Sequence, residues 1–563
     1  MRKLRNRILA ILLILLMVVS MSGCRNEAKH EAEKGTVAPA NGKVNFPLEQ
    51  EMTFDIMVRY DGDLDAALNN CDFWDRLHEM TNVKINFIVL PTDGTMGAFN
   101  AMFAANKEGD AILGGSMINE SDLSLMAANG LLMPMNEFID DPEIMPNFNQ
   151  RVLAESPATK AYITMPDGNI YSLPKYTALE GNYLECPLWI NKSWLDQLNL
   201  PIPTTIEKLE TALVAFRDHD MNGNGNAGDE IPYIFLNGHT YSHMEAILGL
   251  WGLATKDGIN DSYVYIQNGQ VRFAPTSDAY KDALTTLSRW YENELIWSEC
   301  FTGTEETFQA KVSSEVPMVG LFAAKTITSG YEDHYVQLEP VAVEGYQAKW
   351  YRHPGRLGGK GQFSLTRSCE NPEVLMHWID LFYSLENTVA INYGEEADGR
   401  WTRHSDGRYE FFTLPAGKTE ELQVSAPLFY ELFTNVPGAF TATDFEDRIV
   451  LSSIQAMYQE SYAVYEEYMT DEFWPRPYIA DTDVSRLAEL RTDIFHIVTE
   501  KREAWVTGIN DIDADWDDYL RLMDKIGIEE FLAVAEYIYG GVLHLVHFEL
   551  VTTSQQHECV YRQ

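Results

Sequence analysis

Cysteine is scarce in this sequence, and the few that occur follow no pattern. The 563 residues contain 6 cysteines, at positions 24, 71, 186, 300, 369 and 559, and no two of them form a C-x-x-C pair. A zinc site or a disulfide framework needs paired or closely spaced cysteines. We therefore expect neither in this protein.

Basic residues are also under-represented. Lys and Arg total 42 against 84 Asp and Glu, which gives a formal net charge of -42 at pH 7. A field of this sign repels nucleic acids and other polyanions before contact. The composition therefore predicts no nucleic acid partner.

The short motifs of several enzyme classes are missing as well. The sequence has no G-x-S-x-G elbow and no H-E-x-x-H motif, and residues 355–360 have the wrong spacing for a Walker loop and lack its Ser or Thr. We expect no enzyme. A lipid-anchored glycoside hydrolase that uses a pair of carboxylates stays open as the alternative, because such enzymes need no short motif.

Apolar residues, in contrast, are plentiful. Hydrophobic residues make up 45% of the chain and aromatic residues 12%. This content can bury large cores, and the length suits two or three domain-sized units.

The first 50 residues predict a secretory signal peptide and a lipid anchor. Basic residues at positions 2, 3, 5 and 7 precede an apolar run over 8–19, which ends in Met21-Ser22-Gly23-Cys24. This order is typical of a secretory signal peptide, residues 1–23, with lipoprotein cleavage before Cys24. We expect Cys24 to carry lipid and the polar residues 24–50 to form a flexible tether.

Strands and helices alternate from residue 52 onward. Period-two hydrophobicity predicts strands at 54–60, 83–89 and 111–113, and helical spacing predicts helices between them and over about 121–130. Such alternation is typical of a parallel α/β sheet covered by helices. Ligands bind such sheets at the carboxyl ends of strands, so 114–116 (Gly-Gly-Ser) is a candidate edge of a binding cleft.

The later part of the chain carries clear local signals. Asn268-Gly269 separates two alternating runs and predicts a β-hairpin. Ser277 or Asp278 can cap the helix that follows, and Gly527 is expected to end a helix that begins near Trp516.

The Asn- and Gly-rich loop over 218–232 is the most informative stretch. Oxygen ligands at alternate positions, separated by glycines, can wrap a calcium ion. One register starts at Asp218 and places Asp229 at position 12, close to the helix-loop-helix calcium pattern. We prefer the register that starts at Asp220, because its ligands are richer: Asp220, Asn222, Asn224, Asn226, Asp229 and Glu230.

We expect this ion to be structural, because calcium in an oxygen cage activates water poorly. The loop also contains Gly223-x-Gly225-x-x-Gly228, formally a dinucleotide fingerprint. It follows a helix and is rich in acids, so phosphate binding is not expected.

Several segments together resemble a known family. They include LMPMNEFID at 132–140, PDGNIYSLP at 166–174 and LWINKSWL at 188–195, followed by the loop that ends at Asp229-Glu230. With Asn392-Tyr393-Gly394 and the helix near Trp516, they resemble the lipoprotein-type extracellular solute-binding proteins of sugar ABC importers, in the broad family 1 group. The resemblance covers roughly residues 50–538 in a preserved order.

The resemblance implies an α/β fold: a two-lobed periplasmic-binding-protein-like fold with an interlobe ligand cleft. Its lobe boundaries, carried over to this chain, are 51–175 and 362–400 for lobe I, and 176–361 and 401–539 for lobe II. Residues 540–563 depart from the family ending and form an atypical tail. The calcium loop of relatives is shorter by one residue before Asp229-Glu230.

The function implied is a receptor on the extracellular face of the cell membrane, held there by its lipid anchor. It would deliver a carbohydrate, an oligosaccharide, to the permease subunits of an ABC importer, and relatives hold calcium at the Asn/Gly loop. Sugars stack their C–H faces on aromatic rings. The expected contacts are Trp251 in a Gly-rich stretch, and Tyr393 and Trp401 near the last crossing between lobes.

Overall fold

The computed structural model describes most of the chain after residue 43. The described residues are 44–60, 72–91, 93–114, 118, 120–184, 186–255, 263–327, 331, 333–352, 357–394, 396, 401–411, 436–470 and 481–537. They belong to the second of two units, 1–42 and 43–563. Cys24, Gly115, Ser116 and the tail 540–563 therefore lie outside them. Within the described ranges, no helix is both long and apolar enough to cross a membrane.

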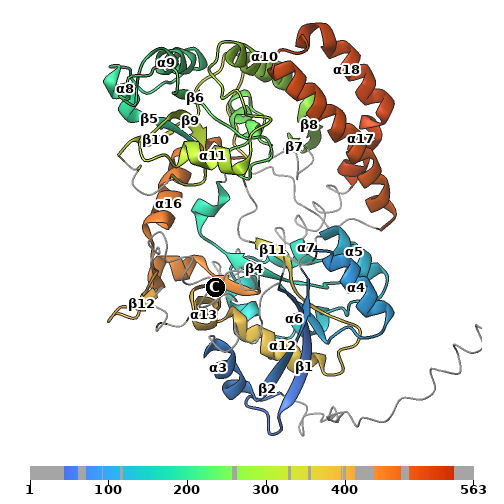
Figure 1. Cartoon of the computed structure of the whole chain (residues 1–563). Coiled ribbons are helices and arrows are strands. Elements are labelled where there is room, and N and C mark those ends of the chain that lie inside the picture. The colour runs from blue at the N-terminus through green and yellow to red at the C-terminus, as the bar shows by residue number, and fades with distance from the viewer. Residues whose placement is uncertain are drawn as a thin grey trace, which may run out of the picture. The chain divides into compact units, whose positions relative to one another are not determined.

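Lobe I is built on a six-stranded sheet (Figure 1). In sheet order its strands are β14 (Gly438–Phe440), β4 (Leu173–Thr177), β11 (Leu357–Leu365), β3 (Ala111–Leu113), β1 (Met52–Arg59) and β2 (Val83–Leu90). β1 pairs in parallel with β2 and β3, as the alternating pattern predicts. β11 pairs antiparallel with β3 and β4, which the sequence did not indicate.

Helices cover both faces of this sheet. They are α3 (Asp72–Thr81), α4 (Thr95–Ala104), α5 (Glu120–Ala128), α6 (Asn136–Ile139), η1 (Phe148–Leu153), α7 (Ala158–Ile163), α12 (Pro372–Asp380), η5 (Leu381–Tyr383) and α13 (Leu385–Tyr393). Neighbouring residues of β1 point to opposite faces. Ile56 accordingly packs in the core with Trp378 of α12, whereas Met57 packs in a second core with Phe99 of α4.

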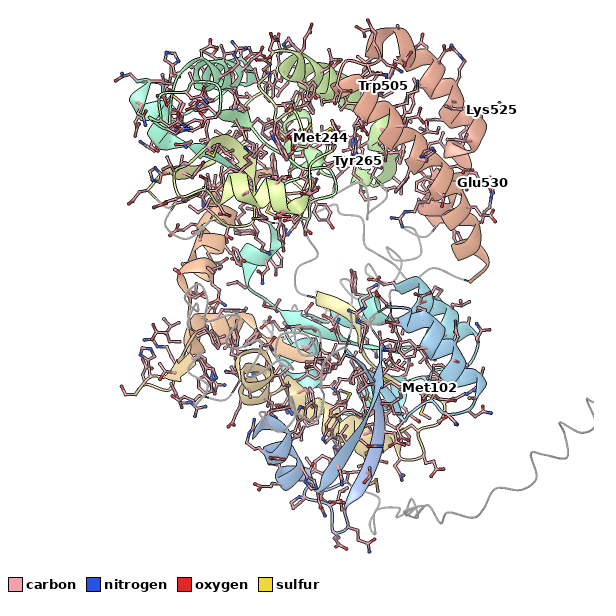
Figure 2. All side chains as sticks on the ribbon, in the orientation of Figure 1. Met102, Met244, Tyr265, Trp505, Lys525 and Glu530 are labelled. Carbon is pink, nitrogen blue, oxygen red and sulfur yellow. The ribbon has the colours of Figure 1, made fainter. Side chains whose placement is uncertain are left out.

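Lobe II has its own four-stranded sheet. Its order is β10 (Tyr335–Leu338), β5 (Leu188–Asn191), β9 (Val319–Ala323) and β6 (Ile231–Tyr233). The surrounding elements are α8 (Lys192–Gln197), α9 (Ile206–Asp218), η3 (Met244–Trp251), β7 (Val264–Gln267), β8 (Gln270–Phe273), α10 (Asp278–Glu292), α11 (Glu305–Val312), α16 (Ser453–Tyr465), α17 (Asp481–Val506) and α18 (Ile512–Ile526). Met244 and Trp505 are buried in the core of this lobe (Figure 2).

The local signals of lobe II are confirmed. β7 and β8 form a hairpin in which Asn268 and Gly269 have φ angles of 54° and 70°, as a tight turn of this type requires. The Ser277 side chain caps α10 by accepting a hydrogen bond from the backbone N–H of Tyr280. Gly527 ends α18 with a φ of 104°, which a glycine adopts without strain.

The segment 401–450 differs from its expected place. The sequence assigned it to lobe II, but β14 pairs with β4 inside the sheet of lobe I. A small sheet of β12 (Trp401–Arg403), β13 (Tyr409–Phe411) and β15 (Ile449–Val450) packs with α13 in a core of its own. The chain therefore leaves lobe I after β15 rather than at residue 401.

A buried ion pair lies within the core of lobe II. Arg502 of α17 is 0% exposed and donates a short hydrogen bond to the carboxylate of Glu245, which is 4% exposed. Arg502 also donates to the hydroxyl of Tyr263 (2.9 Å) and to Oδ1 of Asn237 (2.6 Å). A buried charge is tolerated only when it is paired, so these contacts hold α17 against η3 and against Tyr263, which precedes β7.

Candidate functional site

The loop between α9 and β6 wraps around the carboxylate of Asp220. Its Oδ1 accepts hydrogen bonds from the backbone N–H groups of Gly223 (2.7 Å) and Asn224 (3.1 Å). Oδ2 accepts one from Gly225 (2.8 Å). Gly223 and Gly225 have φ angles of 75° and 87°, in the left-handed region that favours glycine. The glycines therefore allow the backbone to turn tightly around one negative charge.

The asparagine side chains of this loop fold back onto it. Oδ1 of Asn222 accepts a hydrogen bond from the N–H of Asn224 (3.0 Å), and Oδ1 of Asn224 accepts one from Asn226 (2.8 Å). Oδ1 of Asn226 accepts a weaker one from Gly228 (3.2 Å). Each carbonyl oxygen has a second lone pair, so these amides still have capacity to bind a cation.

Two carboxylate oxygens in the loop are buried without a hydrogen-bond partner among the described residues. They are Oδ1 of Asp229 and Oε2 of Glu230. The other oxygens are occupied, because Glu230 Oε1 accepts from Met221 (2.8 Å) and Asn222 (3.1 Å), and Asp229 Oδ2 accepts from Asn224 (2.6 Å). A buried, unpartnered carboxylate oxygen is costly, and a bound cation would remove that cost.

The charges of the loop separate the two predicted registers. Asp218 lies at the end of α9 and pairs with Arg217 at 2.8 Å. Among the described Lys and Arg residues, none forms an ion pair with Asp220, Asp229 or Glu230. The geometry thus favours the register that starts at Asp220. In the described ranges no three His, Cys, Asp or Glu side chains gather as a metal cluster, so asparagine and backbone oxygens would have to complete the site.

The aromatic residues expected to contact sugar are largely covered by protein. Trp251 packs in the core of lobe II. Trp401 is 7% exposed and its Nε1 donates to the carbonyl of Gly394 (2.8 Å). Tyr393 stacks on Phe411 with ring centroids 4.0 Å apart. These rings support the fold of their lobes, and a role in sugar binding stays a prediction.

Polar groups gather where β3 ends and β11 begins, at the carboxyl edge of the lobe I sheet. Gly114 donates its N–H to the carbonyl of Gln362 (2.9 Å). Gln362 is itself buried, and its Oε1 has no hydrogen-bond partner within the described residues. Beside it, Nζ of Lys360 lies 3.9 Å from the centre of the Tyr162 ring. Gly114 was expected at this edge, whereas Lys360 and Gln362 carry no sequence signal for it.

Two of the buried carboxylates of lobe I, Asp380 and Asp444, bear on the hydrolase alternative, which needs a carboxylic acid as proton donor. Burial raises the pKa of Asp380 to about 6, although hydrogen bonds from Phe148 and Asn147 oppose the shift. Those N–H donors lie at 2.8 to 3.0 Å and occupy both of its oxygens. Asp444 is paired with Arg151 at 2.7 Å. Both carboxylates therefore serve the packing of lobe I.

No family model matches the sequence. The fructooligosaccharide ABC transporter substrate-binding protein FusA of Streptococcus pneumoniae serotype 4 is 28% identical over 516 residues, which cover 88% of this chain and 91% of FusA. This similarity extends over both lobes.

Solved structures of solute-binding proteins are also similar to this chain. A FusA EF-hand mutant from S. pneumoniae in complex with fructo-nystose has a TM-score of 0.72 at 25% identity and covers 87% of this chain and 99% of its own. An extracellular solute-binding protein from Bifidobacterium longum subsp. infantis has a TM-score of 0.75 at 21% identity, over 89% of this chain and 99% of its own. The two-lobed α/β fold and the resemblance to the solute-binding proteins of sugar ABC transporters are thereby confirmed.

Proposed function

We propose that this relative of the ABC solute-binding proteins is an extracellular receptor that binds an oligosaccharide and delivers it to the permease of an ABC importer. The observation that carries the proposal is the similarity to FusA, which spans 88% of this chain and 91% of FusA. A similarity of that extent includes both lobes and the segments that join them. Lobes joined in this way can close when a ligand contacts both at once.

The ligand class we propose is a neutral oligosaccharide of the fructooligosaccharide type. FusA is named for that class and has been solved with fructo-nystose. The net charge of -42 disfavours a polyanionic sugar. On lobe I, the unpartnered Oε1 of Gln362 offers an acceptor for a sugar hydroxyl at the edge where ligands of α/β sheets bind.

We also propose that the loop holds a structural calcium ion through Asp220, Asn222, Asn224, Asn226, Asp229 and Glu230. When bound, the ion supplies positive charge to three carboxylates that no described Lys or Arg neutralises. The chain's part is to hold those oxygens in place through the backbone N–H groups of Gly223 and Gly225. The EF-hand of FusA supports a metal site of this kind in a relative.

Binding of fructo-nystose tests the proposed function. The sugar should raise the melting temperature of the purified protein, by mass action corresponding to about 2.7 kcal/mol at a hundredfold excess over Kd. Chromatography of the same mixture should show no shorter sugars. A Gln362→Met variant should bind at least about ten-fold more weakly, equivalent to about 1.4 kcal/mol. Its melting temperature without sugar separately measures the loss of the hydrogen bond that Nε2 of Gln362 donates to the carbonyl of Lys360 (3.1 Å), which the substitution also removes.

The outcomes separate the candidate functions. A thermal shift with galacturonic acid oligomers and none with fructo-nystose would move the ligand class from neutral to acidic sugars. Steady release of shorter sugars would contradict the receptor function and support the glycoside hydrolase alternative. Equal affinity of wild type and Gln362→Met would remove Gln362 from the binding site.

The anchor is a separate part of the proposal. We propose that cleavage before Cys24 leaves this residue as the lipid-bearing amino terminus, because Met21-Ser22-Gly23-Cys24 follows a basic and then an apolar stretch. Cys24→Ala should move the protein from the membrane fraction to the medium, as measured by immunoblotting. Cys559→Ala is the matched control and should leave the protein on the membrane. Retention of Cys24→Ala in the membrane fraction would contradict the anchor.

A further inference from the structure

A small cavity lies in lobe II, away from the calcium loop. Its volume is about 20 Å³, and its lining includes Cys186, His243, Glu245, Thr255 and Trp350. This volume suits one water molecule or a guest of similar size. The hydroxyl of Thr255 lines the cavity, is 6% exposed and has no hydrogen-bond partner within the described residues. A small polar guest would supply the missing partner.

Three side chains connect this cavity to the buried ion pair. Sγ of Cys186 lies 3.6 Å from Nε2 of His243. Nδ1 of the same ring lies 3.3 Å from Oε2 of Glu245, whose other oxygen pairs with Arg502. The groups therefore follow one another in the order Cys186 thiol, His243 imidazole, Glu245 carboxylate and Arg502 guanidinium. In this arrangement the carboxylate orients the ring, and the ring presents its other nitrogen to the sulfur.

The charge of the ring follows from these neighbours. Burial by itself would lower the pKa of His243, but the Cys186 sulfur and the Glu245 carboxylate outweigh burial and raise the pKa to about 10. The raised pKa favours the protonated imidazole, which carries N–H groups on both nitrogens. Among the described residues, the other titratable groups around the ion pair are Tyr233, Tyr263, Tyr280 and Cys300. Tyr465 is a neighbour of Cys186, and His239 is a neighbour of His243.

We propose that Cys186 is an oxidation site for small peroxides, with His243 as its proton donor. The Cys186 thiol releases its proton to solvent as its sulfur attacks one oxygen of hydrogen peroxide, so that an S–O bond forms and the O–O bond breaks. The sulfur is oxidised to a sulfenic acid, and the peroxide is reduced. The leaving hydroxide takes the proton from Nε2 of His243 and departs as water, which leaves the imidazole neutral.

The cavity makes the site selective. Cys186 is 7% exposed and lines the cavity, whose volume suits a molecule of the size of hydrogen peroxide and not a bulky thiol reagent. Cys300 is 0% exposed and is not among the residues that line the cavity. Burial raises the pKa of the Cys300 thiol to about 12, so it is not a thiolate at neutral pH. Cys300 is therefore an internal control in every experiment.

Mass spectrometry of the folded protein tests the proposal. After hydrogen peroxide treatment at pH 7, the protein is quenched, unfolded, alkylated and digested. The Cys186 peptide should gain one oxygen at least about ten-fold faster than the Cys300 peptide gains it. In urea, where the cavity no longer exists, the two rates should converge. Equal rates in the folded protein would overturn the site.

Two variants test the parts of the mechanism. His243→Gln should slow oxidation of Cys186, and an unchanged rate in the folded variant would overturn the role of His243. Because this histidine is buried, the variant's fold is checked by its melting temperature. Thr255→Ile keeps His243 and fills the cavity, so it should also slow Cys186. Unchanged oxidation of Cys186 in Thr255→Ile would overturn access through the cavity.

Discussion

Replacing Glu245 with Gln is expected to lower the free energy of unfolding by about 3–5 kcal/mol, because it leaves a buried arginine without its counter-ion. Arg502 is fully buried, and its Nε already lacks a hydrogen-bond partner among the described residues. After the substitution Arg502 has only neutral acceptors, namely the new glutamine amide oxygen, the Tyr263 hydroxyl and the Asn237 amide oxygen. Urea unfolding followed by tryptophan fluorescence measures the loss.

An exposed pair on the same helix provides the control. Arg486 of α17 pairs with Glu530, and their side chains are 47% and 49% exposed. Solvent screens such a pair, so Glu530→Gln should leave the urea midpoint nearly unchanged. If both substitutions had equal effects, burial would not be the source of the stabilisation.

The pH dependence gives a second check. Burial by itself would raise the pKa of Glu245, but Arg502 and His243 outweigh burial and lower the pKa to about 2, from 4.5 for the ordinary carboxyl. A lowered pKa in the folded state stabilises the protein above the unfolded value and not below the folded one. The difference between wild type and Glu245→Gln should therefore be complete above pH 4.5 and shrink as the pH falls towards 2.

Removing calcium is expected to produce the second large effect. An ion bound only by the folded state contributes about 2.7 kcal/mol at a hundredfold excess over its Kd and about 4.1 kcal/mol at a thousandfold excess. Chelator should therefore lower the melting temperature of the wild type, and added calcium should restore it. Asp220→Ala should show no response to either addition, and should melt at or below the chelated temperature because it also loses the three backbone hydrogen bonds that the carboxylate accepts.

Asp218→Ala is the matched control for this experiment. Asp218 lies two residues away, but it pairs with Arg217 rather than with the loop. This variant should respond to chelator like the wild type. A lost response in Asp218→Ala as well as in Asp220→Ala would select the other register, because that register uses both carboxylates. A wild type that is indifferent to chelator would contradict the calcium site altogether.

The expectations that the structure confirmed are those that depend on neighbouring residues. The strand Ala111–Leu113 was expected from three apolar residues, and the hairpin from Asn268-Gly269. The N-cap at Ser277 and the end of α18 at Gly527 also follow from one or two residues. A cap, a turn or a hydrophobic period involves contacts a few residues apart, so the local sequence specifies it.

Burial and lobe membership depend on distant parts of the chain. Trp401 packs against Tyr409 in a small core beside lobe I, and its contact with a ligand stays a prediction. Nothing in a single sequence separates a tryptophan in a core from one in a binding site, because both are apolar and follow similar spacing. The Asn/Gly loop differs, because its ligand atoms lie within eleven consecutive residues, 220–230.

By itself, therefore, the sequence determined the α/β pattern, the resemblance, the net charge and the composition of the candidate calcium loop. Only the tertiary structure decided that β14 joins β4, that β11 runs antiparallel to β3, and that Glu245 meets Arg502 across 257 positions. These pairings are set by the packing of the whole chain. Their partners are distant in sequence. The residues around a carboxylate or a short strand do not indicate which distant group will pack against it.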